Sequence, residues 1–278
     1  MGYYQDDYDG HGRSPGGFSF PRVSTAVKLL IIINAVVFLA QVAFGVAQID
    51  LSKSFGVMPG ATIDRLHVWQ LFTYMFLHSP RHLLHIFMNM LFLYWFGTEV
   101  ERLLGRRRFL FLYLGSGVAG GLAYAVTQYL FGIRIPAIGA SAAVMGVLVV
   151  YALHYPSRII LLFFVIPMTV KWFVLMIVGV DLVYSVTTYA DGVAHTAHLG
   201  GALFGFLYHR LAPRFAWFFD RLEDRHRERE AKRRADDERR MDEILAKIGR
   251  EGFDSLTRAE RDFLREQSEQ RRDRGYHG

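Results

Sequence analysis

The sequence contains no cysteine among its 278 residues. This absence excludes a disulfide framework, a thiol nucleophile and a metal site built on cysteine, and it leaves the redox compartment undetermined. The zinc-protease motif His-Glu-x-x-His is absent as well. A metal-dependent membrane hydrolase would have to assemble its ligands from scattered histidines, namely His78, His82, His85, His195 and His198. We regard that alternative as weak and expect no cofactor and no metal.

The first 21 residues have almost no aliphatic side chains. They are rich in Gly, Tyr, Asp and Ser, and such a segment cannot bury enough apolar surface to fold alone. We therefore expect residues 1–21 to form a flexible arm. A cleaved signal peptide is not expected, because the first apolar run starts late and is long enough to stay as an anchor.

The chain is instead rich in apolar residues, at 52% of the sequence, and charged residues interrupt them at intervals. This composition is typical of a protein that crosses a membrane several times. The net charge is +6. Because the basic residues mostly lie beside apolar runs or alternate with acids near the C-terminus, membrane topology explains them, and no nucleic-acid partner is expected.

Six apolar runs are predicted to be membrane helices: 24–46, 83–104, 109–131, 139–153, 168–187 and 193–211. Arginines at 22 and 106–108 mark cytoplasmic ends, so both termini are predicted to be cytoplasmic. The predicted fold is all-α, with a six-helix membrane domain over 22–211 and a charged, soluble helical tail over 212–278. Residues 50–80 are predicted to form a partly embedded loop, and the apolar stretch 159–167 to lie along the inner surface.

The fourth run begins with Gly139-Ala140-Ser141. Its serine is predicted to lie at the start of a helix, where the first backbone N–H groups have no intrahelical partner. A hydroxyl beside free amide donors suits acyl transfer, because the donors can receive the charge of a tetrahedral intermediate. By itself Gly-x-Ser is a weak signal, since small residues also let membrane helices pack closely.

The base for such a serine is predicted in the sixth run, at His198. Gly201 and Gly205 share its helix face by their three- and four-residue spacings. Glycines there let a neighbouring backbone approach on the side from which the imidazole projects. The sequence therefore predicts that Ser141 and His198 can meet.

The second run carries His85 and Asn89 four residues apart, on one helix face. Polar groups at membrane depth are costly, so the pair is a functional candidate. A structural alternative is a hydrogen bond between helices.

These elements together resemble the rhomboid family of serine proteases, which cleave within the membrane. Gly139-Ala140-Ser141, the histidine helix from Ala197 to Gly205, and His85-x-x-x-Asn89 all carry the likeness, which spans the chain from Trp69 to Gly205. The resemblance implies a bacterial-type, six-helix intramembrane protease. It further implies a dyad of Ser141 and His198, with His85 and Asn89 helping the Ser141 backbone N–H to hold the oxyanion.

The sequence departs from the family pattern at three positions. Gln70 follows Trp69 where rhomboids carry arginine, Ala142 replaces a common glycine, and Met145 replaces an aromatic residue that packs under the imidazole. None of these changes removes a reacting atom.

Two further ionisable residues, Asp181 and His195, are predicted to lie near the site. Asp181 in the fifth run invites assignment as a triad acid, but we expect it to satisfy backbone or loop donors. His195 is expected to be a loop or packing histidine, and the polar loop 188–192 before it is expected to move.

The tail alternates basic and acidic residues at helical spacing. Thr257 and Glu260 form a capping box, which predicts a helix from Ala259 after a break near Gly252. The tail is predicted to present a solvated face that is open to an unknown cytoplasmic partner.

The sequence thus predicts a serine endopeptidase that cleaves transmembrane or membrane-proximal segments of other proteins. Its substrates should carry helix-weakening Gly or Pro near the cut, because a helix hides its carbonyls in hydrogen bonds. The expected location is the plasma membrane of a bacterium or archaeon. The alternative is a rhomboid-like protein that binds membrane helices without cutting them.

Overall fold

The computed structural model describes residues 23–46, 48–162, 165–187 and 193–265. The predicted flexible arm at 1–21 and the predicted mobile loop at 188–192 lie outside the described residues. The chain divides into two compact units, Met1–Pro213 and Arg214–Gly278. They are described separately below. The boundary between them falls two residues after the predicted one.

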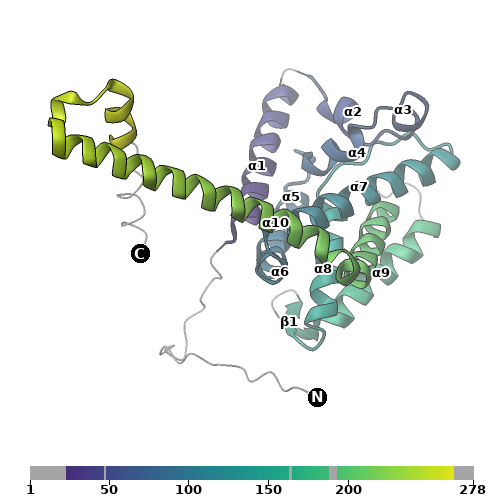
Figure 1. Ribbon diagram of the computed structural model, residues 1–278. Coiled ribbons are helices and arrows are strands. Elements are labelled where there is room, and N and C mark those ends of the chain that lie inside the picture. Colours follow the sequence, from purple (N-terminus) through teal and green to yellow (C-terminus); the bar gives the residue numbers. More distant parts are fainter. Residues whose placement is uncertain (1–22, 47, 163–164, 188–192, 266–278) are drawn as a thin grey trace, which may run out of the picture. The chain divides into compact units, whose positions relative to one another are not determined.

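Helices dominate the first unit (Figure 1). In chain order they are α1 (Thr25–Val46), α2 (Leu51–Phe55), α3 (Pro59–Asp64), α4 (Gln70–Thr73), α5 (Leu83–Phe92), α6 (Thr98–Leu104), α7 (Arg106–Leu130), α8 (Ser141–His154) and α9 (Val170–Thr187). A π-helical turn (Leu93–Gly97) joins α5 to α6. Helix α10 (His195–Glu251) also begins in this unit.

Four helical segments are long and apolar enough to cross a membrane: Thr25–Val46, Leu83–Leu104, Arg106–Leu130 and Val170–Thr187. They confirm four of the predicted spans. The fourth predicted span is the apolar but shorter helix α8, and the sixth falls in the first part of α10. The described chain is therefore that of an all-α membrane protein, and the number of six crossings stays a prediction.

The outer face of α1 shows why this fold needs lipid around it. Leu29, Ile32, Val36 and Leu39 are each between 43% and 66% exposed. A row of large apolar side chains with this much exposed surface would be unfavourable in water and is favourable against acyl chains.

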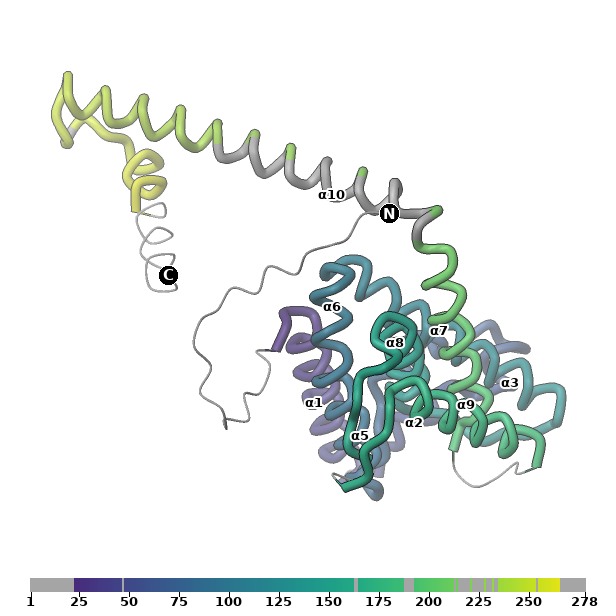
Figure 2. The backbone as a smooth tube through the Cα atoms, turned by 90° about the horizontal axis from the view of Figure 1, so that it is seen from below, coloured from purple at the N-terminus to yellow at the C-terminus, as the bar shows by residue number. Residues whose placement is uncertain are grey.

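Helix α8 lies inside the group of helices, with α6, α7 and α9 beside it (Figure 2). All residues from Ala142 to Ala152 are buried. Glycines on α7 allow this close packing: a Cβ at Gly120 would lie 2.5 Å from the Ala142 Cβ. The small residues of α7 therefore pack against the helix that Ser141 begins.

Glu101 holds the start of α1 in place. Its carboxylate accepts hydrogen bonds from the backbone N–H groups of Ala26 and Val27, both at 2.9 Å, and from the Ser24 hydroxyl. A buried acid at a helix N-terminus satisfies donors that have no intrahelical partner and complements the helix dipole. Glu101 therefore has a structural role at the start of α1, and the neighbouring Arg102 pairs with Glu99 at 2.9 Å.

Gln70 organises the loop between α1 and α5. It is fully buried, and its Oε1 accepts hydrogen bonds from the Thr62 hydroxyl at 2.7 Å and the Met58 N–H at 3.2 Å. Its Nε2 donates to the Ser54 carbonyl at 3.3 Å. An amide that both donates and accepts therefore ties this loop together, whereas the arginine that the resemblance leads us to expect here could only donate.

The stretch after α8 differs from the all-helical prediction. Strands β1 (Ile159–Leu162) and β2 (Ile166–Thr169) form an antiparallel hairpin in which Ile159 pairs with Thr169. The apolar run is too short to distinguish strand from helix by periodicity, and isoleucine favours a strand. As a result α9 begins at Val170, two residues later than the predicted fifth span.

The second unit contains the rest of α10 and a short helical hairpin. Gly252, at φ +83°, ends α10, as the predicted break requires. The capping box is confirmed: the Thr257 N–H donates to Glu260 Oε2 at 2.7 Å, and the Glu260 N–H donates to the Thr257 hydroxyl at 3.4 Å. The helix starts at residue 258, one residue earlier than predicted. Ile244 and Leu256 are buried in this unit.

Candidate active site

Ser141 is the first residue of α8, and two backbone contacts hold the loop that precedes it. Ala137 forms a β-bridge with Val57, and the Gly139 N–H donates to the Tyr74 carbonyl at 2.9 Å. Gly139 has φ +125°, and a Cβ there would lie 2.7 Å from His85 Cε1. Only glycine fits both this backbone conformation and the approach of the imidazole.

His198 reaches Ser141 because α10 packs directly on α8. A Cβ at Gly201 would lie 2.0 Å from the Ala142 carbonyl oxygen, and one at Gly205 would lie 2.5 Å from the Gly146 carbonyl oxygen. With the backbones this close, His198 Nε2 lies 2.8 Å from Ser141 Oγ. The geometry is that of a nucleophile and its base within hydrogen-bonding reach.

Asp181 lies behind His198. Its buried carboxylate is 3.0 Å (Oδ1) and 3.2 Å (Oδ2) from His198 Nδ1, and its Oδ1 is 2.7 Å from His195 Nδ1. An ionised carboxylate only accepts hydrogen bonds, so each Nδ1 carries a proton. In a neutral His198, Nε2 is then free to accept the Ser141 hydroxyl proton.

This arrangement corrects two expectations. Asp181 contacts two imidazoles rather than backbone or loop donors, and His195 shares its carboxylate rather than serving only as packing. The sequence offered one signal for the group, the spacing of three residues between the two histidines, which places them on one face of a helix. It gave no sign of which face of α9 would meet them.

His85 and Asn89 do not act as an isolated pair. The amide Nδ2 of Asn89 lies 3.3 Å from His78 Nε2, and the Ala140 N–H donates to the same nitrogen at 3.5 Å. Because both groups are donors, His78 Nε2 carries no proton and acts as the acceptor, so the His78 ring is neutral. His78 thereby joins the second predicted span to the loop before Ser141, a role that no periodicity in the sequence indicated.

A cavity of about 560 Å³ opens beside the serine. Among its lining residues are Ser141, His198, His195 and His85, while Asn89 is buried at His78 and is not among them. The His85 ring packs against that of His78, with centroids 5.3 Å apart. Of the two predicted oxyanion residues, only His85 therefore faces the space where a substrate carbonyl would lie.

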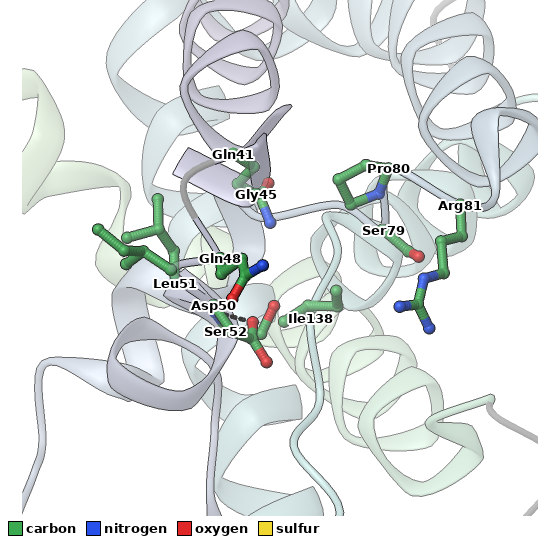
Figure 3. Close-up of a pocket in the computed structure, with 11 residues that line it drawn as sticks. Gln41, Gly45, Gln48, Asp50, Leu51, Ser52, Ser79, Pro80, Arg81 and Ile138 are labelled. Atoms are coloured by element: carbon green, nitrogen blue, oxygen red, sulfur yellow. Dashed lines mark hydrogen bonds between the residues drawn. The ribbon is translucent and has the colours of Figure 1, made fainter. Parts of the chain in front are cut away.

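A second cavity of about 450 Å³ lies on the α1 side (Figure 3). Gln41 and Asp50 line it together with Arg81, and it shares Ser79 and Ile138 with the first cavity. Gln41 is buried and accepts a hydrogen bond from the His78 N–H at 2.8 Å. Ser79 and Ile138 thus line both the cavity at the serine and the one beside it.

Within the described ranges, one group of side chains could hold a metal ion: Asp181, His195 and His198, whose ligand atoms lie within 4.8 Å of one another. Of the five histidines in the metal alternative, His195 and His198 belong to this group, whereas His78, His82 and His85 form no such group within the same ranges.

Comparisons with known proteins agree with this architecture. The Rhomboid domain family matches residues 65–215, more than half of the chain, and the chain belongs to this family. A family of unknown function, DUF6576, matches residues 223–270 in the second unit. The recognition of a rhomboid from Ser141, His198, His85 and Asn89 is thus confirmed at the level of the family.

Individual relatives share the membrane core. The chain is similar to Rhomboid protein 1, mitochondrial, of Saccharomyces cerevisiae, with 34% identity over 54% of this chain and 42% of that protein. It is 29% identical to Rhomboid protease GluP of Bacillus subtilis, over 61% of this chain and 31% of the relative. The Presenilin-associated rhomboid-like protein, mitochondrial, of Rattus norvegicus is 31% identical over 49% of this chain and 36% of its own length. The chain spans less than half the length of each of these three relatives.

Proposed function

We propose that this protein is an intramembrane serine endopeptidase in which Ser141 is the nucleophile and His198 the general base. The observation that carries the proposal is the 2.8 Å separation of His198 Nε2 and Ser141 Oγ, at a cavity within the apolar unit. Two groups from helices far apart in sequence lie at reacting distance there, at the first turn of a buried helix.

In the proposed reaction His198 takes the Ser141 proton as the hydroxyl oxygen attacks the scissile carbonyl. The backbone N–H of Ser141 points from an uncapped helix start and receives the oxyanion, with His85 as a second donor from the cavity wall. His198 then protonates the leaving amine, and water releases the acyl-enzyme. Asn89 contributes through His78, which fixes the Ala140 amide next to the serine.

Asp181 is the positioning residue of this proposal. It holds the Nδ1–H of His198, which fixes the tautomer that accepts the serine proton and stabilises the imidazolium that forms. The dyad expected from the resemblance thereby becomes a triad, supported by the 3.0 Å contact from Oδ1 to Nδ1.

The proposed substrates are transmembrane or membrane-proximal segments with helix-weakening residues near the cut. A carbonyl must leave its helical hydrogen bond before it can reach Ser141. An extended segment that crosses Ile138 would bring a neighbouring side chain to the second cavity, where Arg81 and Asp50 offer charge of both signs.

For the location we retain the plasma membrane of a bacterium or archaeon, with both termini cytoplasmic. The match to Bacillus subtilis GluP supports it, whereas two other relatives carry names that place those proteins in mitochondria. The tail remains open to a cytoplasmic partner in this proposal.

The second candidate function is a rhomboid-like protein that binds membrane helices without cleaving them. It is kept as the alternative because two of the relatives carry names that call them rhomboid or rhomboid-like proteins and not proteases. The presence of both Ser141 and His198 at bonding distance argues against it.

The test compares wild type, Ser141→Ala, His198→Ala and the double variant on a reporter transmembrane substrate in proteoliposomes. Each single variant should abolish cleavage while the protein inserts and melts normally, and the double variant should be no worse, because the pair acts as one unit. Retained turnover in Ser141→Ala would remove the serine mechanism. Proteomic comparison of membrane fragments from cells with wild type and Ser141→Ala would then identify the substrates.

A further inference from the structure

Asp181, His195 and His198 bring three metal-binding atoms to one point. Both imidazoles turn their Nδ1 atoms toward the carboxylate, with contacts of 2.7, 3.0 and 3.2 Å. The side chains are only 5%, 9% and 15% exposed, so packing holds their orientation. Without a metal ion, each imidazole donates a hydrogen bond from Nδ1 to the Asp181 carboxylate.

The same donor set matches a zinc ion. Two imidazole nitrogens and one carboxylate oxygen, with water in the fourth position, are a frequent ligand set of Zn²⁺ in proteins. Bonds of about 2.0–2.2 Å in a tetrahedron place ligand atoms roughly 3.3 Å apart. The contacts from the carboxylate to the two imidazoles, at 2.7–3.2 Å, are about 0.1–0.6 Å shorter than that spacing, and all the ligand atoms lie within 4.8 Å of one another. Movements of this size are within reach of side-chain rotation.

The cavity beside the serine supplies the route and the water. His195 and His198 line this space of about 560 Å³, and Asp181 lies behind them. A hydrated ion can enter it and exchange three of its waters for the protein ligands. Imidazole favours Zn²⁺ over Mg²⁺, which prefers oxygen ligands and gives up water reluctantly.

We propose that Asp181, His195 and His198 form an inhibitory zinc site that turns the protease off. The proposal rests on the function proposed above, because it assigns the same imidazole to both roles. The metal is a regulator here and takes no part in hydrolysis.

The inhibition follows from where the proton sits on His198. In the metal-free protein the neutral ring carries its proton on Nδ1 and accepts the Ser141 hydroxyl at Nε2. When Zn²⁺ occupies the Nδ1 atoms of His195 and His198, the Nδ1 proton of each ring moves through water to its own Nε2, so both rings stay neutral. An Nε2–H donates to Ser141 Oγ and cannot take its proton.

Metal binding is tested first without reference to activity. Ser141→Ala protein in detergent is titrated with Co²⁺, which absorbs visible light strongly when it is tetrahedral. We expect saturation at one ion per chain and loss of the signal in Ser141→Ala/His195→Phe, whose ring still packs against Tyr184. Absence of a saturable signal, or its persistence in the double variant, would overturn the proposal even if the protease function stands.

Inhibition is tested second, on the active protein. Cleavage should fall with added Zn²⁺, recover with a chelator and be unaffected by Mg²⁺ at the same concentration. Removing a residue that only hydrogen-bonds to a metal ligand already lowers metal affinity about 10- to 100-fold, and removing a ligand itself should lower it at least as much. His195→Phe should therefore need at least about 10-fold more Zn²⁺ for half inhibition, relative to its own metal-free rate.

The matched control is His82→Phe, which removes another histidine from the same cavity. Its zinc response should equal that of wild type. If His82→Phe and His195→Phe shift the half-inhibitory concentration equally, or if neither shifts it, the ion acts elsewhere and the proposal is wrong. If His195→Phe is inactive without metal, the Co²⁺ titration decides. A protein that binds Co²⁺ as expected but never cleaves would instead refute the proposed function.

Discussion

Replacing Gly201 with alanine should separate the two proposed reacting groups by a calculable amount. The added Cβ would lie 2.0 Å from the Ala142 carbonyl oxygen, whereas real Cβ contacts stay above about 3.0 Å. The obstacle is a backbone atom of a buried helix and cannot rotate away. Helix α10 must therefore move off α8 by at least about 1 Å.

That movement should break the bond between His198 and Ser141. Their 2.8 Å separation would grow toward 3.8 Å if the shift is along the same line, beyond hydrogen-bonding range. A misplacement of about 1 Å costs roughly 100-fold in rate, which is about 2.7 kcal/mol of transition-state stabilisation. We expect kcat on a reporter substrate in proteoliposomes to fall by that factor.

The control for this variant is Gly179→Ala in α9. A Cβ at Gly179 meets nothing within 4 Å, so its rate should match wild type. Melting temperatures of both proteins show whether each is folded, and rates are taken per folded molecule. If Gly201→Ala were too unstable, Gly205→Ala, whose Cβ would lie 2.5 Å from the Gly146 carbonyl, gives a smaller shift. A wild-type kcat in folded Gly201→Ala would refute the claim that glycine contact sets the reacting distance.

Three further predictions follow from other contacts. Asn89→Ala and His78→Ala should each lower the free energy of unfolding by about 1–3 kcal/mol and lower kcat at least about 10-fold, because each leaves a buried partner unpaired. Thermal melts and active-site-titrated rates should show that the double variant loses less than the sum; unchanged kcat would remove both from the site. Truncation after Pro213 should preserve cleavage in detergent, since none of the proposed reacting groups lies beyond it; loss of activity in a folded protein would contradict this. Hydrogen bonds from the Thr257 N–H and from Lys247 lower the pKa of Glu260 from its usual 4.5 to about 2. The Glu260 carboxylate should stabilise the helix that begins at residue 258 fully above about pH 4.5, and this stabilisation should be lost as the pH falls through about 2. Amide hydrogen exchange at Thr257 should therefore increase over that pH range in wild type but not in Glu260→Ala.

The sequence was sufficient for the parts of the site that depend on local spacing. Glycines three and seven residues after His198 predict which face of its helix meets a neighbour, and the contacts at Gly201 and Gly205 confirm it. The placement of Ser141 at a helix start follows from its position at the beginning of the fourth apolar run, and the structure confirms it.

The sequence was not sufficient where two elements meet through a single polar contact. Asp181 lies on α9, and nothing in its apolar surroundings shows that its face turns to His195 and His198. His78 lies in a loop without periodicity, so its bond to Asn89 depends on tertiary packing alone. The hairpin at 159–169 was missed because a short apolar run fits a strand and a helix equally well.

The central claim is that His198 activates Ser141. Labelling with a fluorophosphonate, followed by mapping of the modified peptide by mass spectrometry, tests it most directly, because the probe reacts with an activated serine whatever the natural substrate is. The account predicts modification at Ser141 in wild-type protein and none in folded His198→Ala. Labelling of a different residue, or equal labelling of Ser141 without His198, would contradict it.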